Sequence, residues 1–157
     1  MKVGVYADIN NLYKTTKLEH SKKLDYEKYL DFVKTFGDVT LAKAYGAQVN
    51  SEGDKFIAYL EKIGFDVTYR KVDVIDINGR KAKIPPIWDC QITMEVLADA
   101  DELDYIFLGV SSKNFLPLVN YLLEQKSKKV MMFSSRVDEE LKAITTHFDV
   151  TTSMLEK

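Results

Sequence analysis

The sequence predicts an α/β protein, built as a helix/sheet/helix sandwich around a mostly parallel central sheet. Short apolar runs of strand length alternate along the chain with segments whose apolar residues recur at helical spacing. Strands that are separated by helices pair in parallel through right-handed crossovers. A small β-hairpin insertion is expected near residues 73–84. Because the 157 residues contain no linker or repeat, we expect a single domain over residues 1–157.

The strands are predicted from short runs of apolar and β-branched residues. The first run, Val3 to Ala7, is apolar throughout, which is typical of a strand that is buried on both faces. The others are bounded by glycine or by charged residues. The expected strands are Val3–Ala7, Val39–Tyr45, Phe65–Val72, Tyr105–Val110, Val130–Phe133 and an edge strand at Phe148–Thr151.

The helices are predicted from apolar residues three and four positions apart. Asp25 is a suitable N-cap for the first helix, and Gly64 can take the left-handed conformation that ends the second. The adjacent prolines 85 and 86 stop strand pairing and lead into the third. The expected apolar stripes run over Tyr26–Phe36, Phe56–Ile63, Ile87–Ala100, Phe115–Leu122 and Val137–Ile144.

Asn78 and Gly79 give the strongest turn signal in the chain. They separate the alternating segments Val74–Ile77 and Arg80–Ile84. Both central residues of a type I′ turn need positive φ, which Asn and Gly tolerate. The sequence therefore predicts a two-residue hairpin here.

Composition excludes several classes of function. The single cysteine, Cys90, rules out an internal disulfide, and His20 and His147 are too few for a multi-histidine zinc site. A net charge of −2 provides no overall field for nucleic acid, so any RNA contact would use a local lysine patch. The longest uncharged run, Asn114 to Leu123, has ten residues, so no membrane span is expected. Without a signal-peptide pattern, we expect a cytoplasmic protein.

Ligands of parallel α/β sheets bind beyond the carboxyl ends of the strands, where the crossover direction switches. This rule selects four segments of the chain. They are Asp8–Asn11, Gln48–Asn50, Ser111–Asn114 and Ser134–Ser135.

Asp8 and Asp89 are the candidate metal ligands, because carboxylate and amide oxygens suit Mg²⁺ or Mn²⁺. Both acids have a competing interpretation as helix-terminal residues. Glu95 lies six residues after Asp89 and faces another side of the helix, so it either supports a ligand from behind or faces solvent. Trp88 is either a core residue or a lip beside Asp89.

Two other segments have competing interpretations. The loop Ser111–Asn114 offers backbone N–H groups and hydroxyls to a phosphate, or forms an ordinary turn with Ser112 or Asn114 as a cap. The acidic stretch from Asp99 to Asp104 is interpreted as a solvated loop.

Four motifs in order resemble the NYN domain, a PIN-like ribonuclease family with a Rossmann-like sheet, and in particular its bacterial LabA-like branch. Segment Val5–Leu12 is similar to the family's strand ending in Asp-x-x-Asn, and Lys43–Gly46 is similar to its Arg-Ala-Tyr-Gly. Asp89 and Glu95 stand at the two acidic positions of a central helix. Segment Phe107–Val119 is similar to a strand of the family that is followed by a Gly-Asp-Ser-Asp-Phe motif and then by a Pro-Leu-Val motif. In this sequence Ser112 and Asn114 stand in place of the two aspartates.

This resemblance implies metal-dependent hydrolysis of RNA, weakened by the two missing charges. Asp8, Asp89 and Asn114 would be the catalytic residues and would bind Mg²⁺ or Mn²⁺. Asn11, Ser112 and Lys113 would contact the RNA substrate, and Glu95 would lie behind the ligands.

Two alternatives remain open. The first is a catalytically inert PIN-like module that binds RNA or a protein partner, which the residues Ser112 and Asn114 favour. The second is a haloacid-dehalogenase-like phosphatase that uses Asp8–Asn10 as its opening motif. A homodimer is also left open.

Overall fold

The computed structural model describes residues 1–48 and 51–157, and it confirms the predicted α/β class. All strand pairs of the six-stranded sheet are parallel, in the order β3-β2-β1-β6-β7-β8. These strands are β1 (Lys2–Asp8), β2 (Asp38–Gln48), β3 (Asp66–Lys71), β6 (Tyr105–Gly109), β7 (Lys129–Phe133) and β8 (Thr146–Phe148).

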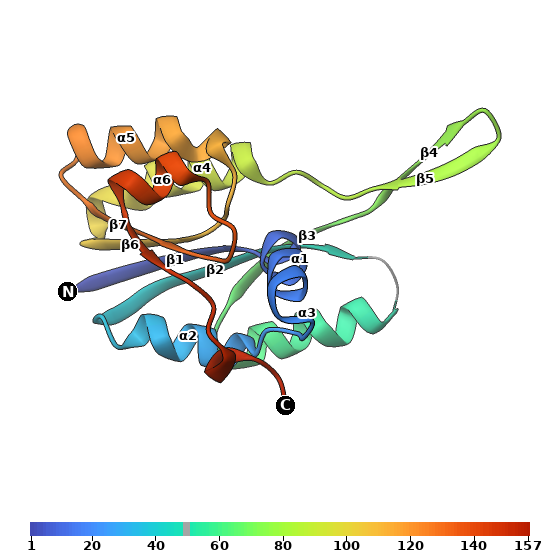
Figure 1. The fold of residues 1–157 in the computed structure, drawn as a ribbon, viewed down its shortest axis with the longest axis horizontal. Coiled ribbons are helices and arrows are strands. Elements are labelled where there is room, and N and C mark those ends of the chain that lie inside the picture. The colour runs from blue at the N-terminus through green and yellow to red at the C-terminus, as the bar shows by residue number, and fades with distance from the viewer. Residues whose placement is uncertain (49–50) are drawn as a thin grey trace.

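Helices cover both faces of the sheet (Figure 1). One layer holds α1 (Ile9–His20), α2 (Tyr26–Lys34) and α3 (Ser51–Ile63); the other holds α4 (Asp89–Asp99), α5 (Leu116–Glu124) and α6 (Glu139–Ile144). Short 3₁₀ turns lie at Ala100–Glu102, Lys113–Phe115 and Thr152–Met154.

The alternation of side chains along each strand explains the two-layer core. Val5 of β1 and Phe107 of β6 belong to the apolar cluster formed with helices α1, α2 and α3. Tyr6 and Leu108, the next residues along these strands, belong to the cluster formed with α4 and α5. Successive strand residues point to opposite faces, so a strand that is apolar at every position needs cover on both sides. The uniformly apolar first strand therefore determines its own place at the centre of the sheet.

The predicted hairpin is present and stands apart from the main sheet. Strands β4 (Asp73–Ile77) and β5 (Arg80–Ile84) form a separate antiparallel pair. Asn78 and Gly79 have φ values of 53° and 77°, as a type I′ turn requires. In Figure 1 the hairpin extends well beyond both helical layers.

Helix α1 was not predicted. Its signal is Asp8 as the N-cap, followed by the buried residues Ile9, Leu12 and Thr16 on one face. The two asparagines and the many polar residues of this segment conceal that stripe. Asp8 is therefore both the last residue of β1 and the cap of α1.

The edge strand lies earlier than expected. We predicted it at Phe148–Thr151, whereas β8 covers Thr146–Phe148. After Phe148 the chain turns toward α1, where the carbonyl of Val150 lies 3.0 Å from Nε2 of His20. That carbonyl is therefore used by a side chain instead of a sheet partner.

None of the helices in the described parts of the chain has the length and apolar character needed to span a bilayer.

Candidate functional site

The carboxylate of Asp8 lies at the point where the crossover direction of the sheet switches. β1 pairs with β2 on one side and with β6 on the other, and the chain returns to β6 only after building β2 and β3. Because α1 begins at the next residue, Asp8 Oδ1 accepts a hydrogen bond of 3.2 Å from the backbone N–H of Asn11. The side chain is thereby held at the carboxyl edge of the sheet.

The pKa of Asp8 is raised from its ordinary value of 3.8 to about 6, and burial is the largest cause. The negative charge of Asp89 contributes to this rise, whereas the backbone N–H groups of Asn11 and Asn10 act in the opposite direction. Asp8 and Asp89 come from different layers of the protein, β1 and α4. The charge of Asp89 therefore acts on the carboxylate of Asp8, although burial has the larger effect.

Asp89 is the first residue of α4 but does not cap it. The N-cap position is Trp88, which makes no side-chain capping bond. Asp89 instead accepts a hydrogen bond of 3.0 Å at Oδ2 from Nδ2 of Asn114, in the 3₁₀ turn after β6. Asn114 thus presents its amide nitrogen, rather than its oxygen, to the carboxylate.

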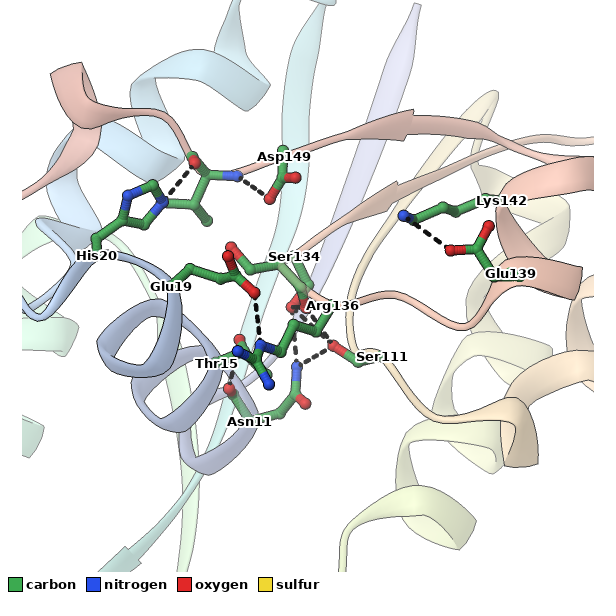
Figure 2. Close-up of polar contacts among 12 residues, drawn as sticks. Asn11, Thr15, Glu19, His20, Ser111, Ser134, Arg136, Glu139, Lys142 and Asp149 are labelled. Carbon is green, nitrogen blue, oxygen red and sulfur yellow. Dashed lines mark hydrogen bonds and ion pairs between the residues drawn. The ribbon is translucent and has the colours of Figure 1, made fainter.

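Asn11 links the ends of β1, β6 and β7. Its Nδ2 donates to Oγ of Ser111 at 3.1 Å and to Oγ of Ser134 at 3.0 Å, and Figure 2 shows the three side chains converging. Both hydroxyls lie within donor distance of the carbonyl of Ser135, at 2.8 Å from Ser111 and 3.2 Å from Ser134. The amide of Asn11 therefore holds the switch point together and does not reach Asp8 with its side chain.

Arg136 lies beside this network and was not among the predicted residues. It follows β7, is exposed, and forms an ion pair with Glu19 on α1 (Figure 2). Its backbone has a φ of 55°, in the left-handed region that few residues other than glycine adopt. The signal in the sequence was its place immediately after Ser134 and Ser135, at a strand's carboxyl end.

The other predicted substrate contacts have partners within the protein. Oγ of Ser112 accepts from the backbone N–H of Asn114 at 3.1 Å and caps the 3₁₀ turn, which is the ordinary-turn interpretation. Lys113 forms an exposed ion pair of 3.0 Å with Glu140. Exposed ion pairs are worth little, so Lys113 can exchange its partner for a phosphate.

Glu95 belongs to an ionic cluster with Lys43 and Asp99. Nζ of Lys43 lies 3.1 Å from Glu95 and 2.9 Å from Asp99, and the three side chains are 17–28% exposed. The hydroxyl of Tyr6 donates to Asp99 at 2.9 Å. This cluster joins β1 and β2 to α4.

The interpretation of Asp99 as a solvated residue was wrong. Asp99 falls on the inner side of α4, opposite the register pair Tyr6 and Lys43. Only the pairing of β1 with β2 brings that lysine to it. Asp101 does remain exposed, in an ion pair with Lys126.

Trp88 is a core residue. It is 1% exposed and packs against Tyr45, with ring centroids 5.7 Å apart, while the guanidinium of Arg70 lies 4.2 Å from its ring centroid. The anchored indole fixes the start of α4 and hence the position of Asp89.

The described residues contain no group of three or more His, Cys, Asp or Glu side chains that could hold a metal ion. The available donors are the carboxylates of Asp8 and Asp89 and the Oδ1 atom of Asn114, whose Nδ2 is already bonded to Asp89. These are hard oxygen donors, and the repulsion that raises the pKa of Asp8 is relieved by a cation. The donor set fits one divalent ion with few protein ligands, completed by water.

The segment Gln48–Asn50 was also expected near the site. Residues 49 and 50 lie outside the described residues. Gln48 ends β2, and its amide donates to the carboxylate of Asp54 on α3.

Comparison with known proteins gives a family and a fold. The family model of the NYN domain matches residues 2–152. The chain is also similar to the crystal structure of a protein of unknown function from Vibrio parahaemolyticus. That similarity has a TM-score of 0.86 and 21% sequence identity, over 99% of this chain and 96% of that chain. No curated protein matches.

Proposed function

The chain belongs to the NYN domain family, with its PIN-like nuclease-type fold, and from this premise we propose that it is a ribonuclease dependent on Mg²⁺ or Mn²⁺. The observation that carries the proposal is that Asp8 ends β1 beside β6, and that Asn114, in the turn after β6, donates a hydrogen bond to Asp89. A carboxylate whose pKa is raised to about 6 by burial and by a second carboxylate is poised to bind a cation at neutral pH.

Asp8 and Asp89 would hold the divalent ion, and Asn114 would orient Asp89 through its hydrogen bond of 3.0 Å. When bound, the ion would lower the pKa of a coordinated water and stabilise negative charge on the attacked phosphate. The backbone N–H of Asn11 keeps Asp8 directed into the site, and its side chain keeps the loops after β6 and β7 in place.

RNA is the proposed substrate, bound through its phosphates. Lys113 and Arg136 are exposed cations on the loops after β6 and β7, and each forms an ion pair with an exposed glutamate. Such contacts are sensitive to salt and carry little sequence information. The cytoplasm remains the proposed location for this reaction.

The test is cleavage of single-stranded and structured RNA by the full chain with Mn²⁺ or Mg²⁺. We expect Asp8→Asn to lower the rate at least about 100-fold, because it removes a metal-binding charge without removing bulk. The matched control is Asp101→Asn, an exposed acid paired with Lys126, which should leave the rate unchanged. Equal rates for wild type and Asp8→Asn would overturn the assignment of the site.

One observation favours the second candidate, an inert module that binds RNA. The described residues contain no group of three or more His, Cys, Asp or Glu side chains that could hold a metal ion, and Ser112 and Asn114 are engaged in local hydrogen bonds. RNA binding that is unchanged by EDTA, together with no cleavage in Mn²⁺, would select this candidate.

A further inference from the structure

The hairpin β4–β5 has an apolar face that nothing in the described chain covers. Side chains directly opposite each other in an antiparallel pair lie on the same face, and successive residues alternate. The register therefore places Ile75, Ile77, Ala82 and Ile84 together, and we call this the isoleucine face. Ile75, Ile77 and Ile84 are 38%, 54% and 41% exposed.

The opposite face of the hairpin has a different character. It carries Asp76 paired with Lys81, and Val74 paired with Lys83. Three of its four side chains are charged, as expected of a surface that remains in water. The hairpin is thus amphipathic, although it projects away from the core that an amphipathic sheet would normally cover (Figure 1).

A two-stranded hairpin is at best marginally stable in water without packing on one face. No other strand of the described chain pairs with β4 or β5. An apolar face on a projecting arm is typical of a surface that is covered by association.

The charges at the ends of the isoleucine face indicate what covers it. Asp73 lies at the base of the hairpin beside Ile84, and Arg80 lies at the tip beside Ile77. When two hairpins stack face to face in opposite directions, the base of one lies over the tip of the other. Asp73 of each copy then lies over Arg80 of the other copy, at both ends of the contact, and the isoleucines lie between these two ion pairs.

We propose that the isoleucine face is a self-association surface, on which a second copy of this chain packs its own hairpin in the opposite direction. This contact is isologous, so a two-fold axis closes it as a dimer. A pair of two-stranded faces is smaller than the roughly 800 Å² per partner of a standard interface, so the dimer is reversible. The catalytic proposal and this one are independent of each other.

The first test is sedimentation of the full chain over about 1 to 200 µM, a range that brackets a micromolar Kd. We expect a monomer–dimer equilibrium in the wild type. Ile75→Lys should weaken it at least tenfold, because Ile75 pairs with Ala82 at the middle of the face and the change places a charge at the centre of the contact. The matched control is Val74→Lys on the opposite face, which should leave the equilibrium unchanged. A monomer at every concentration, or equal effects of the two lysines, would overturn the proposal.

The second test addresses the direction of packing. Asp73→Arg and Arg80→Asp should each weaken the dimer, because each places like charges over one another. The double variant should recover it, since the two ends exchange their signs. Failure of the double variant to recover association would overturn the antiparallel packing. Far-UV circular dichroism and cleavage of RNA serve as independent readouts, which these surface changes should not alter.

Discussion

The carboxylate of Asp8, at the end of β1, lies within electrostatic reach of the carboxylate of Asp89, at the start of α4, and the charge of Asp89 adds to the rise in the pKa of Asp8. Burial is the larger cause of that rise. Natural proteins tolerate such repulsion mainly at functional sites, where the strain is relieved by a ligand.

Asp8→Asn should stabilise the protein at alkaline pH. The folded-state pKa of Asp8 is raised to about 6 from 3.8, so its contribution to stability is full below pH 4 and is lost as the pH rises through 6. Asn cannot ionise and still caps α1. We expect a gain of up to about 3 kcal/mol in the free energy of unfolding at pH 8, by urea denaturation, and almost none at pH 4. A loss of stability at both pH values would contradict this.

Mn²⁺ should stabilise the wild-type protein by binding to Asp8 and Asp89. A ligand at ten times its Kd adds about 1.4 kcal/mol to the free energy of unfolding, which raises Tm by roughly 4 °C for a chain of this size. Protons compete for Asp8, so the shift should be larger at pH 8 than at pH 5. Thermal melts of Asp8→Asn and Asp89→Asn should show no comparable shift. Equal shifts in all three proteins would indicate binding elsewhere.

Asn114→Asp should strengthen metal binding and weaken the metal-free protein. The change replaces the amide that donates to Asp89 Oδ2 at 3.0 Å with a third carboxylate. Affinity for Ca²⁺- and Mg²⁺-type ions rises with the number of ligand charges, so we expect Mn²⁺ to bind about tenfold more tightly by calorimetry. Asn114→Ala is the matched control, because it removes the hydrogen bond without adding charge. Weaker binding by both variants would argue against a metal at Asp89.

Lys43→Met should be strongly destabilising. It leaves Glu95 and Asp99 charged, partly buried and without their shared cation, at a cost of about 3 kcal/mol in the free energy of unfolding. Lys126→Met, which breaks an exposed ion pair with Asp101, should cost less than about 1 kcal/mol. Urea denaturation at pH 7 measures both. Similar costs for the two variants would mean that the cluster does not hold α4 to the sheet.

Asn11→Asp should destabilise the switch point more than Asn11→Ala. The alanine variant loses two hydrogen bonds, at about 1–3 kcal/mol. In the aspartate variant a carboxylate also faces the hydroxyl oxygens of Ser111 and Ser134. Both hydroxyls can donate to the carbonyl of Ser135, so their oxygens face the carboxylate with lone pairs, which is repulsive. Chemical denaturation at pH 7 gives the order. Greater stability of the aspartate variant would mean that the hydroxyls are free to turn.

The parallel sheet and the hairpin could be predicted because their signals are local. An apolar run without alternation, such as Val3–Ala7, needs cover on both faces, and Asn78-Gly79 selects one type of turn. Helix α1 escaped prediction because its apolar stripe is narrow and interrupted by polar residues. The family match over residues 2–152 agrees with the ordered motifs that were found in the sequence.

The amino-acid sequence by itself determined the order along the chain of the strands and of every helix except α1, the turn of the hairpin and the edge of the sheet at which to look for a site. Only the tertiary structure decided that Asn114 donates to Asp89, that Asn11 joins three strand ends, and that Lys43 is shared by Glu95 and Asp99. The reason is physical: periodicity reports which face of an element is buried, whereas the partner of a polar group depends on the register and packing of distant segments.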